Sequence, residues 1–352
     1  MTAFKIRTRM KQRVMVLLFF CFNEHLYAQI LYVDVNKGKP FARGTIEEPL
    51  LSVEEAVNMA NKFRGDKPVV IKLAPGLYTL THLLIIAGNR ISDTNTYSLE
   101  ALIMPDDTNW LPSRMPVIQV AADSNRAGKL QHASIAVQVE RNNVSIKGIK
   151  FLGNPNPASE YFYAIERKNK TLKHLKISQC YFIGEKNSAA IQGAIFAQGE
   201  RIHITRCIFY NCKNAILSFL NVRNFSLTHS IIYGAYEGAF WFGYAEDANL
   251  PFTFNNNIIA NSNYAIVGYK GTHRNYVFSN SLFVDNKYYL GFNGDTVEPD
   301  IVNKPTENNI QKTGKVILNE VIAEGIPKNY LNLSSASAGK DIDAGIFMKK
   351  ND

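Results

Sequence analysis

Short runs of alternating apolar and polar residues fill most of the chain, and one eight-residue phrase recurs along it. In each copy, apolar residues stand at the first and third positions and an apolar residue closes the phrase, as in Ile202-His-Ile204-Thr-Arg-Cys207-Ile-Phe209. Successive copies start 31, 27, 23, 27 and 24 residues apart, which is typical of a solenoid. The copies begin at Val144, Leu175, Ile202, Phe225, Phe252 and Tyr276.

Each unit contains a further apolar segment that opens on a pair such as Ala164-Ile165 or Ala215-Ile216. All these segments are short, alternate with a period of two and are bounded by Asn, Gly, Ser or Lys, so they predict strands rather than helices. Three strands per unit, stacked on the same strands of the next unit, predict an all-β, single-stranded right-handed parallel β-helix. A leucine-rich repeat is the alternative, but its consensus leucines and helix-like return half are missing.

The N-terminal part supplies a cap for the open end of this solenoid. Ser52-Val-Glu-Glu55 is a capping box, and Val53, Ala56, Val57, Ala60 and Phe63 lie on one face of the predicted helix. We predict one β-helix domain over residues 29–352, with a cap over about 29–80, repeated coils over about 81–300 and a closing segment over 301–352.

The first 28 residues differ from the rest because basic residues precede the apolar run Val14 to Phe22 and Ala28 follows. This arrangement predicts a secretory signal peptide, and therefore a secreted or periplasmic protein, while nine apolar residues are too few for a transmembrane segment. Met1 and Met10 are both open as the start. The net charge is +9 for the full chain and falls to +5 without this segment. This modest excess, with no Lys/Arg-rich run, does not predict a nucleic-acid partner.

The remaining cysteines, Cys180, Cys207 and Cys212, are odd in number and match no zinc spacing, so they predict small buried thiols. Cys180 and Cys207 occupy equivalent positions in consecutive units and should be stacked neighbours. No cofactor or metal is predicted. A calcium site would need clustered acids, and Asp106-Asp107 is the nearest candidate. The oligomeric state is not determined by these patterns.

Three segments resemble the secreted, pectin-lyase-like right-handed β-helix proteins of bacteria. They are "LYVDVNKGKPFARGTIEEPLLSVEEAV", "VVIKLAPGLYTL" and "NYLNLSSASAGKDIDAGI", the last of which lacks the Ser-Pro pair of that family. The resemblance implies the β-helix fold and a carbohydrate-related function, but the superfamily includes lyases, hydrolases, epimerases and non-catalytic binders. The motifs of the chondroitinase-B-like lyases and the polygalacturonases are absent from the sequence.

If the second residue of each Ala-Ile pair points inward, alternate residues form columns on the outside. One predicted column is Glu166, Phe196, Leu217, Trp241, Val267 and Gly291, and the next is Lys168, Gln198, Phe219, Gly243, Tyr269 and Asn293. Aromatic faces stack on sugar rings, so Trp241, Tyr269 and Phe219 are candidate substrate-binding residues, together with Glu246 and Asp247. Packing under inserted loops is the alternative.

The ionisable residues beside these aromatics suggest a reaction on a polysaccharide, with uronic-acid polymers favoured. β-Elimination needs a cation for the carboxylate, a base and an acid. Arg274 or Lys270 suits the first role, His273 or Lys270 the second, and Tyr244 or Tyr269 the third.

Two other functions remain open. Paired carboxylates, Glu237 with Glu246 or Asp247, would support a glycoside hydrolase. A non-catalytic glycan-binding or surface-structural protein would need no convergent acid and base.

Overall fold

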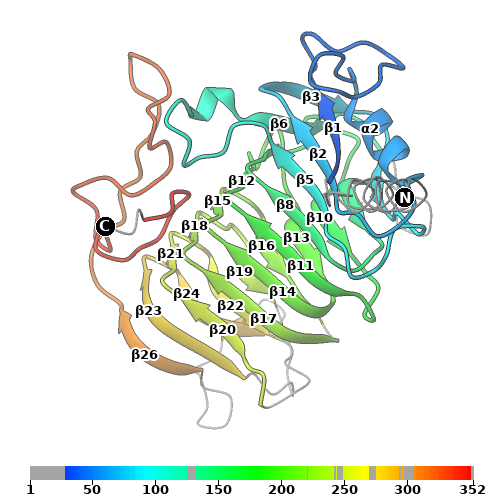
Figure 1. The fold of residues 1–352 in the computed structure, drawn as a ribbon. Coiled ribbons are helices and arrows are strands. Elements are labelled where there is room, and N and C mark those ends of the chain that lie inside the picture. The colour runs from blue at the N-terminus through cyan, green and yellow to red at the C-terminus, as the bar shows by residue number, and fades with distance from the viewer. Residues whose placement is uncertain are drawn as a thin grey trace, which may run out of the picture.

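The computed structural model describes residues 28–124, 132–219, 221–241, 243, 249–268, 275–292, 295–296 and 305–349. Of residues 295 and 296 it describes the backbone alone. Within these ranges the chain is a right-handed parallel β-helix, and its strands stack from the N-terminal cap toward the C-terminal strand β26 (Figure 1). No helix in the described ranges has the length and hydrophobicity that a membrane crossing requires. The predicted signal peptide lies outside the described residues, apart from Ala28.

One sheet of nine strands forms one side of each coil, and a sheet of 17 strands forms the other two sides. The nine-stranded sheet contains β4 (Leu84–Ile86), β7 (Ala133–Val139), β10 (Tyr161–Arg167), β13 (Gly193–Ala197), β16 (Asn214–Leu217), β19 (Gly238–Trp241), β22 (Tyr264–Gly268), β24 (Tyr288–Phe292) and β25 (Asp295–Thr296). All its pairs are parallel except β24 with β25.

The larger sheet consists of two parallel ladders that share the strand β23. The first ladder is β1 (Gln29–Val33), β2 (Val69–Leu73), β5 (Tyr97–Ala101), β8 (Val144–Lys147), β11 (Lys173–Ser178), β14 (Gly199–Thr205), β17 (Val222–Thr228), β20 (Phe252–Asn255), β23 (Tyr276–Val284) and β26 (Thr306–Gln311). The second is β3 (Gly76–Leu80), β6 (Pro116–Val120), β9 (Lys150–Leu152), β12 (Tyr181–Ile183), β15 (Ile208–Tyr210), β18 (Ile231–Tyr233) and β21 (Ile258–Ala260), which pairs with β23.

A single residue with positive φ turns the chain from the first ladder to the second. Gln179, Arg206, His229 and Asn256 occupy this position in successive coils, with φ between 52° and 56°. Next to this position, the buried side chain of Asn257 accepts a hydrogen bond from Ser230 N and donates one to the Leu227 carbonyl in the coil before it. The bend thus leaves its backbone groups satisfied.

Apolar side chains of the repeated phrase fill the interior of the coil. Phe151, Phe182 and Phe209 stack with centroids 5.2 and 4.9 Å apart and nearly parallel rings. The three cysteines are buried and free, as predicted, and Cys180 and Cys207 interact as neighbours.

Helix α2 (Val53–Ala60) covers the N-terminal end, and the short 3₁₀ helix η1 (Pro112–Arg114) lies between β5 and β6. Ser52 caps α2 by accepting a hydrogen bond from Glu55 N at 3.3 Å, as predicted. The reciprocal half of the capping box is absent, because the Glu55 carboxylate accepts from the backbone N–H of Phe41 instead. The helix therefore also holds the preceding loop.

Residues after β26 return along the outside of β21, β18 and β15 (Figure 1). Val316, Leu318, Leu331 and Ile346 form a second apolar cluster with outward residues of those strands and with Trp110. A bidentate ion pair joins Arg206 to Asp343, and Gln179 donates to the carbonyl of Ile346 at 3.0 Å. This segment therefore covers one outer face of the solenoid.

Candidate functional site

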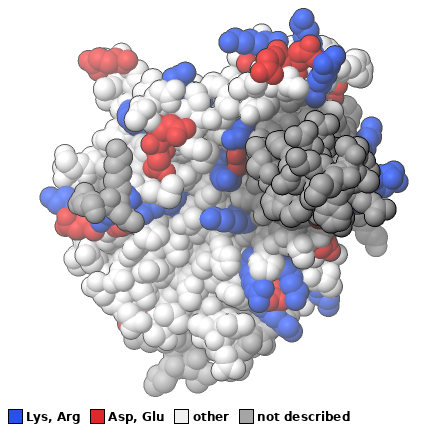
Figure 2. All heavy atoms as spheres, in the orientation of Figure 1, with Lys and Arg blue, Asp and Glu red and all other residues white. Residues whose placement is uncertain are grey.

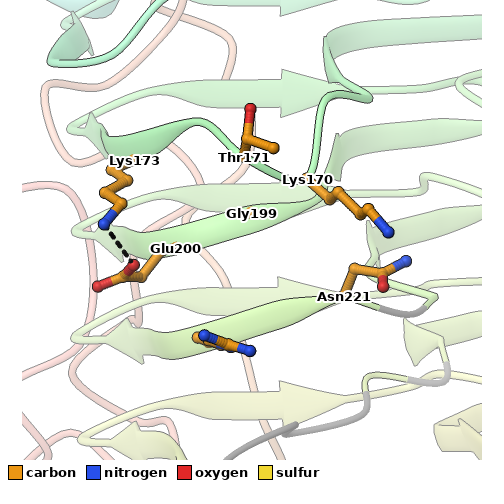
Figure 3. A pocket seen from close by; sticks show the side chains of 7 residues that line it. Lys170, Thr171, Lys173, Gly199, Glu200 and Asn221 are labelled. Carbon is orange, nitrogen blue, oxygen red and sulfur yellow. Dashed lines mark ion pairs between the residues drawn. The ribbon is translucent and has the colours of Figure 1, made fainter.

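A groove of about 510 Å³ lies where successive coils turn from the nine-stranded sheet into β11, β14 and β17. In Figure 3, Lys173 and Glu200 point toward each other at one end, and Lys170 and Asn221 lie at the other. Backbone pairing places Lys173, Glu200 and Arg223 side by side on three consecutive rungs. The complete lining is Lys170, Thr171, Lys173, Gly199, Glu200, Asn221 and Arg223.

Positive charge exceeds negative charge in this groove. Glu200 is its one acidic lining residue, and that carboxylate lies 3.2 Å from Lys173 Nζ and 3.3 Å from Arg201 Nε. Figure 2 shows basic side chains surrounding an acidic one over β11 and β14. Since Lys170 and Arg223 add further charge, the groove as a whole suits an anionic ligand.

The groove floor requires glycine at position 199. Gly199 has a φ of 99°, and a Cβ there would lie 2.3 Å from the carbonyl oxygen of Leu172. Behind it, the fully buried Arg167 donates from Nε to the Gln198 carbonyl at 2.7 Å. Burial lowers the pKa of Arg167 to about 9, so this guanidinium adds positive charge beneath the floor at neutral pH.

Beside the groove, a second outward column crosses the same three strands. Lys176, His203 and Ser226 are paired in register, and the His203 ring lies 2.8 Å from Ser226 Oγ through Nδ1. Arg201 donates from Nη1 to His174 Nε2 at 3.0 Å on the groove side of this column. The groove and the column together make up what we call the basic face. It consists of Lys170, Lys173, His174, Lys176, Glu200, Arg201, His203, Arg223 and Ser226.

His203 differs from the lysines and arginines around it because its charge is set by its surroundings. Partial burial lowers its pKa, and the nearby His174, Lys176 and Arg201 lower it further. The imidazole is therefore neutral at neutral pH, although it lies among cations. A neutral imidazole among cations can accept a proton from a bound acid group.

The outer face of the nine-stranded sheet has a different character, and its predicted register is confirmed. The ladder runs through Glu166, Phe196, Leu217, Trp241, Val267 and Gly291. Leu217 is 3% exposed and Val267 1%, so these outward side chains are packed rather than free for a ligand. Trp241 is half-buried on the rung between them.

The second predicted column falls beyond the strand ends, since β13 ends at Ala197 and β16 at Leu217. Phe219 packs edge-on against Phe196 at 5.1 Å. Glu237 accepts a hydrogen bond from Asn214 Nδ2 at 2.7 Å and lies 3.7 Å from Lys213 Nζ. Its carboxylate therefore has structural partners in the turn before β19.

The other seven predicted site residues all lie outside the described residues. They are Tyr244, Glu246, Asp247, Tyr269, Lys270, His273 and Arg274.

The carboxylates of the calcium candidate are engaged in hydrogen bonds. Asp106 accepts hydrogen bonds from Gln179 Nε2 and Met348 N, and Asp107 from Met104 N. In the described part of the chain, no three His, Cys, Asp or Glu side chains gather as metal ligands.

Sequence reasoning did not identify the basic face. Lys176 and His203 stand at the second position of the repeated phrase, between two interior residues. The phrase predicts a strand there and no functional role. The repeat does contain a signal for this face. Its second position points outward and varies in residue type, reading Ser, Lys, His, Ser, Thr and Val in successive copies. Lys173, Glu200 and Arg223 share the register of the phrase, two residues before it, but the groove also takes Lys170, Thr171 and Asn221 from turns that no repeat aligns.

A scan against protein-family models finds no match, and a search of curated proteins finds none. Among solved structures, one described as rhamnogalacturonan lyase matches with a TM-score of 0.53 and 12% identity, over 75% of this chain and 70% of that one. The pectin methylesterase of Aspergillus niger has a TM-score of 0.44 and 14% identity, over 81% and 86% of the two chains. The pectin methylesterase PemA of Erwinia chrysanthemi has a TM-score of 0.42 and 13% identity, over 92% and 99%. At 12% identity, the likeness to the first of these structures shows the fold, a right-handed parallel β-helix, and nothing finer.

Proposed function

We propose that the protein is an exported β-helix that binds an acidic polysaccharide on its basic face and cleaves it by β-elimination. The observation that supports this most directly is the excess of cations in the groove at Lys170, Lys173 and Arg223. Glu200 offsets only part of that charge.

The geometry of a solenoid suits a linear polymer. Adjacent rungs lie about 4.8 Å apart, so equivalent side chains on β11, β14 and β17 form a regular row across the coils. A chain of uronate sugars carries a carboxylate at each residue, and several weak contacts then act together. The row on these strands is Lys173, Glu200 and Arg223, and together with Lys170 beside it the net positive charge can hold such a chain without a deep pocket.

Elimination is favoured over hydrolysis because it makes use of the cations. Loss of the proton next to the carboxylate builds negative charge on that carboxylate, which nearby Lys and Arg side chains stabilise. The solved neighbour with the 0.53 TM-score is also described as a lyase. Lys270, His273, Arg274 and Tyr244, which lie outside the described residues, are the alternative set for the cation, base and acid of this reaction. Hydrolysis through Glu237 has less support, because that carboxylate has structural partners.

The binding test compares the wild-type protein with the double variant Lys173→Gln/Arg223→Gln on polygalacturonate, alginate and a neutral glucan. We expect the wild type to bind an acidic polymer in low salt and the variant to bind it about 10-fold more weakly, because two surface charges are lost. Glu200→Gln should bind about threefold more tightly, because it removes the opposing charge. The matched control is Lys315→Gln/Lys340→Gln, which removes two exposed charges elsewhere.

The reaction test follows the products of each polymer. Unsaturated ends that absorb in the ultraviolet indicate elimination, whereas new reducing ends without that absorbance indicate a hydrolase. Wild-type protein that binds none of the acidic polymers, or a groove variant that binds as well as the control, would contradict the proposal. Binding without any cleavage would leave a glycan-binding protein and contradict the enzymatic part.

A further inference from the structure

In the column Lys176, His203 and Ser226, a neutral proton acceptor stands between rungs that carry other functional groups. Lys176 lies on the rung before His203, and Ser226 lies on the rung after it. All three side chains point away from the coil interior, since Ile202 and Ile204 on either side of His203 are fully buried. A ligand in the groove would therefore extend over His203.

Ser226 fixes the orientation of the imidazole. With Nδ1 2.8 Å from Ser226 Oγ, the tautomer that donates from Nδ1 to the hydroxyl leaves the lone pair of Nε2 available. Ser226 lies on the rung after His203, so the stacking of the coils places its hydroxyl against the imidazole. Such orientation is what a general base requires.

The charged groups around His203 come from all three strands of the face. His174 and Lys176 face it from β11, Glu200 and Arg201 share its own strand, and Arg223 lies on β17. Lys176 and Arg201 are both exposed, and both lower the pKa of the imidazole. The carboxylate of a bound sugar would be held by Lys176 and by the remaining N–H groups of Arg201, whose Nε and Nη1 contact Glu200 and His174.

We infer that His203 is the general base of a β-eliminating site, with Lys176 and Arg201 holding the substrate carboxylate; this inference rests on the proposed function. Nε2 of His203 takes the proton from C5 of a uronate residue. The C5–H electron pair forms the C4=C5 double bond, and the bond from C4 to the glycosidic oxygen breaks. That oxygen takes a proton from water and becomes the hydroxyl of a new reducing end, and His203 returns its proton to solvent.

The test uses His203→Gln, with His82→Gln as the matched control, because His82 is an exposed histidine beyond β3, away from the basic face. Removing a general base typically costs at least about 100-fold in turnover, so His203→Gln should lose that much. Its affinity for the polymer should stay within about threefold of the wild type, since the groove cations remain. The control should retain wild-type turnover.

The pH profile separates a base from a merely structural residue. Wild-type turnover should fall as the pH drops through a midpoint below 6.5, the ordinary value for histidine, because the protonated ring cannot accept a proton. In Lys176→Gln the midpoint should move upward, since one cation that lowers the pKa of His203 is gone. A structural role for either residue would leave the midpoint in place.

Unsaturated products from His203→Gln at the wild-type rate would overturn the inference and leave the proposed function intact, as would an unchanged midpoint in Lys176→Gln. A wild type that binds acidic polymer without forming unsaturated ends would overturn the inference but not the binding. A wild type that does not bind acidic polymer would overturn both.

Discussion

The two outer faces of the same coil have opposite characters. On the nine-stranded sheet, outward residues such as Phe196 and Leu217 are buried, whereas on β11, β14 and β17 outward residues such as Arg201 and Arg223 are exposed. Both sets belong to parallel strands and face away from the interior. The difference shows that the repeat fixes which side chains enter the coil, and that each outer face acquires its role from residues the repeat does not constrain.

The largest effect should come from Leu217→Ala on the apolar face. Leu217 is only 3% exposed, so truncation should lower the free energy of unfolding by about 2–4 kcal/mol, as for an interior residue. Thr253→Ala, an exposed position on the ladder that contains Ser226, is the control and should change it by less than about 0.5 kcal/mol. The comparison fails if urea unfolding finds the two variants equally stable.

A third outer face, covered by the C-terminal segment, combines apolar packing with charge. Asp343→Asn should lower the free energy of unfolding by about 1 kcal/mol at pH 7, with Asp341→Asn as the exposed control. Hydrogen bonding from Arg206 lowers the pKa of Asp343 below its ordinary 3.8, so the contribution is complete above pH 3.8 and is lost as the pH falls below it. Thermal melting across this range should show the variant converging on the wild type at low pH. A constant gap between them would contradict this assignment.

The smallest effect is expected for Trp241→Phe. If the basic face binds the polysaccharide, affinity should change by less than about twofold, because Trp241 lies on the other outer face, on the rung between buried Leu217 and Val267. Titration of the variant with the same polymer measures this directly. A loss of more than about fivefold would reverse the comparison and restore the aromatic residues as the sugar-binding site.

Much of the fold could be predicted from the sequence because interior positions obey a strict rule. Cys180 under Cys207, the ladder through Leu217 and Trp241, and the cap at Ser52 all follow from local pattern and equal spacing. The partner of Glu55 could not be predicted, because Phe41 reaches it through a loop with no repeat. The basic groove was missed for a different reason. Its charged residues on the strands stand just before the repeated phrase, where the interior does not constrain side-chain identity, and Lys170 and Asn221 come from turns.

The sequence by itself determined the β-helix, the strand register and the identity of the interior, because a period of two and a recurring unit leave one way to bury the apolar residues. Only the tertiary structure decided what each outer face does. It brought Lys173 within 3.2 Å of Glu200, set His203 against Ser226 and brought Asp343 to Arg206 across 137 residues. These side-chain contacts lie outside the interior that the repeat fixes, and the last one needs the C-terminal segment to fold back over the coils, so no local pattern determines them.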